Sequence, residues 1–153
     1  MRTPALVLAA ALVAAVSTAA QAQSQGVVVK QSAYSVKETL DRLESIFKAK
    51  GIRVFARVDH AAGAKRIKKD LAPAELLIFG NPKIGTPLME SNIVSGLDLP
   101  MKVLAYRDAD KVFIAYNHPG YLTRRHGIKG RNRLVQTVSK ILTNLTDQAT
   151  KDR

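Results

Sequence analysis

The chain contains no cysteine among its 153 residues, and this absence removes several kinds of chemistry at once. No disulfide can support the fold, so stability must come from packing. There are also no thiolate ligands for zinc or iron–sulfur clusters, and no cysteine nucleophile. The sequence likewise lacks a nucleophile elbow, a phosphate-binding loop and a paired-carboxylate signature. It therefore favours a non-catalytic protein and leaves the question of an enzyme open.

Acidic residues are scarce: 12 Asp or Glu stand against 24 Lys or Arg, which gives a formal net charge of +12. In a cytoplasmic protein this surplus would suggest a nucleic-acid partner. Two dense basic clusters contribute to it, Lys65–Lys69 and Arg124–Arg133. In an exported protein they suit a small anionic ligand or an anionic envelope surface, and we expect no nucleic acid. The alternative is a cationic surface that is simply solvated.

Long apolar runs are confined to the N-terminus. Met1 and Arg2 precede an Ala-, Leu- and Val-rich run over residues 4–16, and Ala20-Gln21-Ala22 has the small-x-small pattern of a secretory cleavage site. We predict a signal peptide over residues 1–22 and an exported protein, periplasmic or secreted. An uncleaved anchor is the alternative, although the run is shorter than the roughly 20 residues that cross a bilayer. We expect no transmembrane segment in the mature chain.

Residues 23–153 show neither an internal repeat nor a linker, and we predict a single α+β domain there. Apolar periodicity predicts strands at 26–30, 52–58, 75–80, 101–107 and 111–116, and helices at 36–50, 88–94 and 132–147. Short helical segments are expected over 60–68 and after Pro119. The order β-α-β-β-α-β-β-α predicts a mainly antiparallel or mixed sheet with helices packed on one side.

Several local signals support these elements. Ser35-Val36-Lys37-Glu38 fits a capping box at the start of the first helix, and Gly51 supplies the left-handed residue that commonly ends one. The apolar run over residues 76–79 is typical of a strand buried on both faces. Thr86 followed by Pro87 is typical of a helix start, with the hydroxyl as the cap.

Several short motifs occur in a fixed order along the chain. They are Asp59-His60-Ala61-Ala62-Gly63-Ala64, Leu77-Ile78-Phe79-Gly80-Asn81-Pro82, Gly85-Thr86-Pro87-Leu88-Met89, Leu97-Asp98-Leu99-Pro100, Tyr116-Asn117 and Arg125-His126-Gly127. Together they resemble the family called domain of unknown function 302, over about residues 27–142. The resemblance implies a compact α+β domain and a tendency to form homodimers. It implies no activity and transfers no catalytic residue.

Polar side chains follow several of the predicted strands. The candidates for ligand binding are His60, Asn81, Tyr116, Asn117 and His126. Polar groups at the ends of neighbouring strands can converge on one pocket, which is a common place for a ligand in a domain of sheet and helices. The predicted function is therefore an exported protein that binds a small ligand or has an accessory role in the envelope.

Two of these histidines also offer a metal site. His60, His126 and Asp59 can supply three ligands to zinc or a similar divalent ion, with the fourth position open. No His-x-x-x-His pattern supports such a site. The alternative is that the imidazoles bond to backbone carbonyls and fix the turns, in which case no cofactor is expected.

A hydrolase acting on an anionic or polar substrate is the alternative function. His126 or His60 would then act as the general base. Asn81 or Asn117 would stabilise an oxyanion, and the arginine pair at 124–125 would hold a carboxylate or phosphate.

Overall fold

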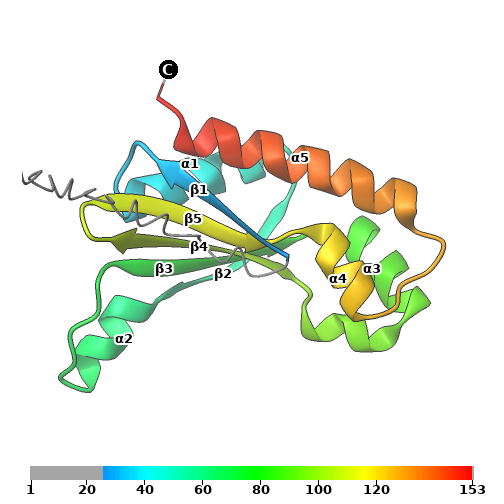
Figure 1. The fold of residues 1–153 in the computed structure, drawn as a ribbon, viewed down its shortest axis with the longest axis horizontal. Helices are drawn as coiled ribbons and strands as arrows, with labels where there is room; N and C mark the ends of the chain where they lie inside the picture. The colour runs from blue at the N-terminus through cyan, green and yellow to red at the C-terminus, as the bar shows by residue number, and fades with distance from the viewer. Residues whose placement is uncertain (1–25, 153) are drawn as a thin grey trace, which may run out of the picture.

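The computed structural model describes residues 26–152, so the predicted signal peptide over 1–22 lies outside the described residues. The elements are β1 (Val27–Ser32), α1 (Val36–Ala49), β2 (Arg53–Asp59), α2 (His60–Arg66), β3 (Ala74–Gly80), α3 (Pro82–Ser91), the 3-10 helix η1 (Ile93–Leu97), β4 (Met101–Asp108), β5 (Lys111–Asn117), α4 (Pro119–Arg125) and α5 (Asn132–Thr150). Figure 1 shows their arrangement.

One five-stranded sheet forms the frame, in the order β1-β5-β4-β3-β2, and every neighbouring pair is antiparallel. Strands β2 to β5 follow one another as a meander, and β1 adds to the outer edge of β5. Helix α1 connects the two edge strands, β1 and β2, across one face of the sheet. The predicted α+β class and element order are confirmed.

The core lies between the sheet and the helices α1 and α5, which cover the same face (Figure 1). Alternate residues of a strand point to opposite faces. One cross-strand row, formed by Leu77, Val103 and Tyr116, is therefore buried beneath the helices. The Phe47 ring from α1 packs 4.3 Å from the Phe79 ring of β3, measured between centroids. Packing of this single layer supplies the stability that a chain without disulfides requires.

The expectation that residues 76–79 are buried on both faces is wrong. Only Leu77 and Phe79 are buried, because the helix pair covers one face and no second helix pair covers the other among residues 26–152. The opposite face carries an apolar row that crosses all five strands. We call it the open-face row, and its members are Val58, Leu76, Leu104, Ala115 and Val29.

Helix α3 begins earlier than predicted. Its N-cap is Asn81, whose side-chain oxygen accepts a hydrogen bond from the backbone N–H two residues later, at 2.9 Å. Pro82 takes the first helical position, where its missing N–H leaves no bond unmade. Thr86 is therefore not the cap, and Pro87 lies inside the helix.

The structure forms the serine half of the predicted capping box and the predicted end of α1. The Ser35 hydroxyl accepts from the Glu38 N–H at 3.2 Å at the start of α1, and Gly51 has a φ of +66° just after that helix. Strands β4 and β5, both predicted, pair as a hairpin in which Asp108 lies opposite Lys111, so the loop has two residues where three were expected. Asp59 caps α2 by accepting from the Ala62 N–H at 2.8 Å, so the segment after β2 is helical although it contains Gly63.

A lysine on β1 attaches the sheet edge to α5. The Lys30 ammonium donates to the Asp147 carboxylate at 2.7 Å, the Thr146 hydroxyl at 2.8 Å and the Thr143 carbonyl at 2.9 Å. The hydrogen bond from Lys30 holds the pKa of the Asp147 carboxyl below its ordinary value. These bonds fix the C-terminal half of α5 over β1.

We expect Asp147→Asn to lower the free energy of unfolding at pH 7 by about 1 kcal/mol, since the partner is partly screened by solvent. The folded carboxyl has the lower pKa, so its stabilisation is present above the unfolded value near 4 and is lost as the pH falls through the folded value. Denaturant unfolding of both proteins between neutral and strongly acidic pH measures this. The difference should shrink in acid, and a difference independent of pH would contradict the ion pair.

Candidate functional site

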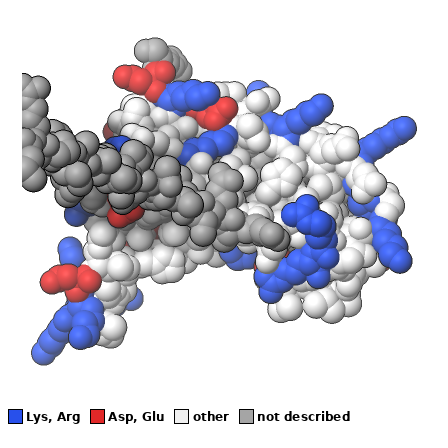
Figure 2. Space-filling model, viewed as in Figure 1, with Lys and Arg blue, Asp and Glu red and all other residues white. Residues whose placement is uncertain are grey.

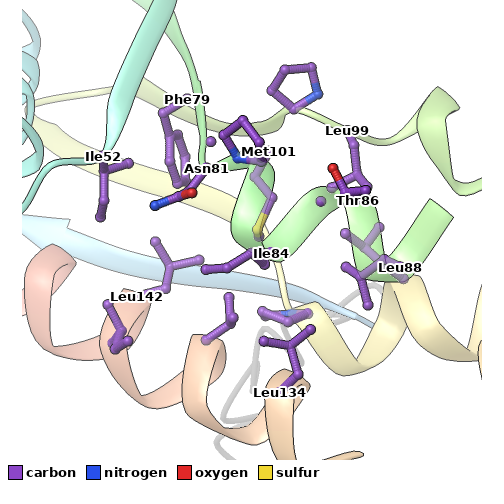
Figure 3. Close-up of a pocket in the computed structure, with 18 of the residues that line it drawn as sticks. Ile52, Phe79, Asn81, Ile84, Thr86, Leu88, Leu99, Met101, Leu134 and Leu142 are labelled. Carbon is purple, nitrogen blue, oxygen red and sulfur yellow. The ribbon is translucent and has the colours of Figure 1, made fainter. Parts of the chain in front are cut away.

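A cavity of about 350 Å³ lies where the sheet ends and α3, α4 and α5 come together. Figure 3 shows apolar side chains from several elements around the same space. Residues that define its walls are Phe79 on β3, Met101 on β4, Ile84 and Leu88 on α3, and Leu134 and Leu142 on α5.

The local sequence explains why this space exists. Strand β3 stops at Gly80, and the capping Asn81 turns the chain into α3 beyond the end of the sheet. Helix α5, with 19 residues, is about 28 Å long, whereas the strands of six to eight residues span about 20–26 Å. The N-terminal half of α5 therefore extends past the sheet, where α3 and α4 lie opposite it (Figure 1).

The cavity is lined almost entirely by apolar groups. Asn81 and Thr86 carry the only polar side chains among its lining residues, and no charged residue or histidine lines it. Burying an unpaired ion in such a space is costly, whereas apolar groups gain from leaving water. Its volume falls within the range of small-molecule pockets. The site therefore suits an apolar ligand, or the apolar part of an amphiphile.

Of the five predicted ligand-binding residues, one lines this cavity, and that residue is Asn81. Tyr116 is buried in the core, with the Lys30 ammonium 5.9 Å from its ring centroid. Asn117 follows it on β5 and therefore points to the opposite face of the sheet. Neither side chain belongs to the cavity lining.

His126 follows α4 and is buried in a small polar cluster. Its Nε2 lies 2.6 Å from an Asp98 carboxylate oxygen, and Arg125 Nε lies 3.4 Å from the same oxygen. The His126 carbonyl accepts from the Asn92 side-chain amide at 2.7 Å. These contacts tie the end of α4 to η1. The imidazole thus links the turn after α4 to a carboxylate, whereas the alternative expected a backbone carbonyl as its partner.

His60 and Asp59 lie at the other end of the sheet. Asp59 pairs with Glu75 at the start of β3, whereas Asn81 follows the end of that strand. Figure 1 accordingly places α2 far from α3 and α4. The structure therefore does not bring His60 and Asp59 to His126, either as one pocket or as ligands of one ion. Among residues 26–152 no group of three His, Asp or Glu could hold a metal.

The two basic clusters also lie at opposite ends. Lys65–Lys69 comprises the last two residues of α2 and the three residues that follow it, and α2 itself has no buried residue. Arg124–Arg133 runs from α4 to the start of α5, beside η1. Figure 2 shows Lys and Arg side chains gathered at both of these ends.

Sequence reasoning found Asn81 but missed the apolar residues that line the cavity. Leu134, Val138 and Leu142 read as one apolar face of a core helix, and that pattern does not reveal that half of the face lies beyond the sheet. The available signal was the length of α5, which exceeds that of every predicted strand.

Ser95, on η1, is buried, and its hydroxyl is the one buried side-chain polar atom without a hydrogen-bond partner in the described part of the chain. The side chain of nearby Asn92, in contrast, makes two hydrogen bonds. Its oxygen accepts from the Val94 N–H at 3.0 Å, and its NH2 group donates to the His126 carbonyl.

Comparison with known proteins gives a family and a fold. The sequence profile described as "Domain of unknown function DUF302" matches residues 28–149. The crystal structure of the uncharacterized conserved protein DUF302 from Bacillus stearothermophilus aligns with a TM-score of 0.74 at 20% identity, covering 82% of this chain and 99% of that one. At this identity the likeness concerns the fold.

Curated relatives are also similar over part of their length. The fluoride-specific ion channel FluC 1 of Brucella suis is 46% identical over 104 residues, which are 67% of this chain and 41% of the relative. FluC 1 of Brucella abortus has the same identity, with 38% of its length covered. The chain thus spans about two fifths of the curated relatives that it matches. Within residues 26–152, no helix has the length and apolar character needed to cross a membrane.

We expect Ser95→Ala to raise the free energy of unfolding by about 1 kcal/mol, because a buried hydroxyl without a partner is destabilising. Asn92→Ala is the matched change at the N-cap of the same short helix, and it should lower that free energy by about 1 kcal/mol because it removes the cap. Denaturant unfolding of the three proteins measures both. A loss of stability in Ser95→Ala would show that the hydroxyl is satisfied in solution.

Proposed function

The chain belongs to the family described as Domain of unknown function DUF302, and since that membership assigns no activity, we propose from the structure that it is a binding protein for one small apolar molecule. The observation that carries the proposal is the cavity of about 350 Å³ between the sheet end and α3, α4 and α5. The export expected from the N-terminal sequence would make it a carrier or accessory protein of the envelope.

The lining of the cavity supports one class of ligand. Aliphatic and phenylalanine side chains surround the space, while Thr86 is exposed at its margin and Asn81 is partly exposed. An amphiphile with one aliphatic chain or a small ring would bury its apolar part and keep its polar group near these two residues. Each buried methylene is worth about 0.8 kcal/mol, so the affinity should rise with chain length until the cavity is filled.

Binding is favoured over hydrolysis because the cavity offers no general base. A base must reach the reacting proton within hydrogen-bond distance, directly or through one water. His126 is engaged with Asp98 outside the lining, and His60 lies at the opposite end of the sheet. These positions also weaken the case for a small anionic ligand in this cavity.

The curated relatives suggest a setting and not a ligand. They are named fluoride-specific ion channels, and their length is more than twice that of the matched segment. Fluoride is a poor ligand for the cavity, because an anion would lose its hydration and meet no cation there. A domain of this kind joined to a membrane protein supports an accessory role close to a membrane.

The test is a binding titration with a fluorescent probe that has one aliphatic chain, at concentrations below that at which the probe aggregates. Wild type should bind saturably, and Val138→Trp, which fills the cavity from α5, should weaken binding by about tenfold or more, or roughly 1.4 kcal/mol. Gln136→Trp, on the exposed side of the same helix, is the control and should bind like wild type. No saturable binding, or an equal loss in both variants, would reject the cavity as the site.

We further propose that the protein forms a homodimer through the open-face row. Val29 and Val58, at the two edges of this row, are 49% and 39% exposed, and the row presents one apolar strip across the whole sheet. Large apolar strips on a folded chain mark contact surfaces. A second copy offers the same strip, and a twofold axis would pair the two strips with each other.

We expect wild type to sediment as a dimer and Leu104→Glu, at the centre of the row, as a monomer, because a carboxylate would be buried without a partner. Thr137→Glu on the exposed surface of α5 should leave the dimer intact. Sedimentation equilibrium at several concentrations decides this, with circular dichroism to confirm that each variant is folded. A monomeric wild type at about 100 μM would reject this interface.

A further inference from the structure

Three large aliphatic side chains project from η1 into solvent. Ile93 is 75% exposed, Val94 is 53% exposed and Leu97 is 74% exposed. We call these three residues the η1 tip. They lie in the yellow-green segment between α3 and β4 in Figure 1, at the end of the molecule away from α2. Single exposed aliphatics are ordinary, but three within five residues mark a surface that contacts something else.

The pattern of burial in this short helix is inverted. In the segment Ile-Val-Ser-Gly-Leu, the residue turned inward is Ser95, and the aliphatic residues are turned outward. Folding alone favours the reverse, since burying an unpartnered hydroxyl is destabilising and exposing aliphatics forgoes their transfer energy. The stability of this chain therefore does not explain the arrangement, whereas a contact surface does.

Hydrogen bonds to the turn after α4 hold the η1 tip in place. The Asn92 side-chain oxygen caps η1 by accepting from the Val94 N–H, and the Asn92 side-chain NH2 donates to the His126 carbonyl at 2.7 Å. Asp98, just after η1, bonds to the buried His126 ring at 2.6 Å. The segment is thus fixed at both ends to the turn after α4, and its apolar side chains are presented on a rigid support.

Positive charge gathers at the end of the molecule that carries the tip. The segments that form this end, residues 82–100 and 119–135, contain six Lys or Arg and two acidic residues. Both acidic side chains are already engaged, Glu90 with an arginine at 3.3 Å and Asp98 with His126. Among the residues that the structure describes, Arg124 and Lys129 have no acidic group within ion-pair distance. Figure 2 shows blue side chains gathered over this end.

We propose that the η1 tip docks the protein on a lipid bilayer with anionic headgroups. The three aliphatic side chains enter the boundary between headgroups and acyl chains, while Arg124 and Lys129 face lipid phosphates. This occupant matches both properties of the surface, apolar at the centre and cationic around it. A second copy of the same tip would bring like charges together, which disfavours that contact.

The docking surface and the cavity share one segment of chain. Met89 and Leu99, on either side of η1, line the cavity, and a side chain at Gly96 would already stand 3.4 Å from the Met89 sulfur. The η1 tip and the cavity wall are thus opposite sides of the same thin layer. If the proposed binding function holds, the bilayer on which the tip docks is the source of the apolar molecule.

The experiment is co-sedimentation of full-length mature protein with vesicles of phosphatidylcholine containing about 30% phosphatidylglycerol. Wild type should bind, less tightly as salt is added, and far less to pure phosphatidylcholine. The triple variant Ile93→Ser, Val94→Ser, Leu97→Ser should bind at least about tenfold more weakly. Arg124→Gln and Lys129→Gln should each cost about fivefold, from roughly 1 kcal/mol per cation at an anionic surface.

The double variant Ile67→Ser, Leu71→Ser is the matched control, since these aliphatics are 71% and 51% exposed, one inside the other basic cluster and one just after it. It should bind vesicles like wild type. Absence of wild-type binding, an η1 variant that binds equally well, or an equal loss in this control would each overturn the proposal. Self-association that the η1 variant abolishes, without vesicle binding, would assign the tip to a second copy and also overturn it.

Failure of the docking proposal can be separated from failure of the binding function. The η1 variant should still take up the soluble fluorescent probe, because its substitutions lie outside the cavity lining. Val138→Trp should lose the probe and still bind vesicles. Loss of probe binding in wild type, with vesicle binding retained, would reject the cavity function alone.

Discussion

Lys30, on the edge strand β1, makes three hydrogen bonds to α5, and these bonds determine where the longest helix crosses the sheet. With its C-terminal half fixed there, the N-terminal half of α5 must extend past the strand ends. Helices α3 and α4 lie opposite that overhang and enclose part of it. The cavity, the turn held by His126 and the position of η1 all follow from one helix that is longer than the sheet it covers.

Much of the fold could be predicted from local chemistry. The capping box at Ser35, the left-handed Gly51 and the alternation along the β4–β5 hairpin each depend on few neighbouring residues. The start of α3 could not be fixed in this way, because Asn81-Pro82 serves equally to end a strand and to begin a helix. The prediction that residues 76–79 are buried on both faces failed for another reason. An apolar run shows that a strand is hydrophobic, but it does not show which face of the sheet a helix covers.

The candidate site was less accessible to sequence reasoning. Polar residues at strand ends led to Asn81, which does line the cavity. The same reasoning grouped it with His60, because it took no account of strand direction: in an antiparallel meander, successive strands end on opposite sides. The residues of α5 that line the cavity have the same spacing in the sequence as residues of a helix packed in a core. The η1 segment becomes unusual only when burial shows that its serine is inside and its aliphatics are outside.

The antiparallel pairing of β1 with β5 has a consequence for the order in which the chain folds. Strands β2 to β4 each pair with the next strand in the sequence, but β1 finds its partner only after β5 has formed. The Lys30–Asp147 contact joins residues 117 positions apart in sequence. Closing so long a loop is entropically expensive and slow. The first strand and the last helix therefore dock late and together, and until they do, the helix-covered face of the meander is protected by α1 alone, which packs on β2, β3 and β4.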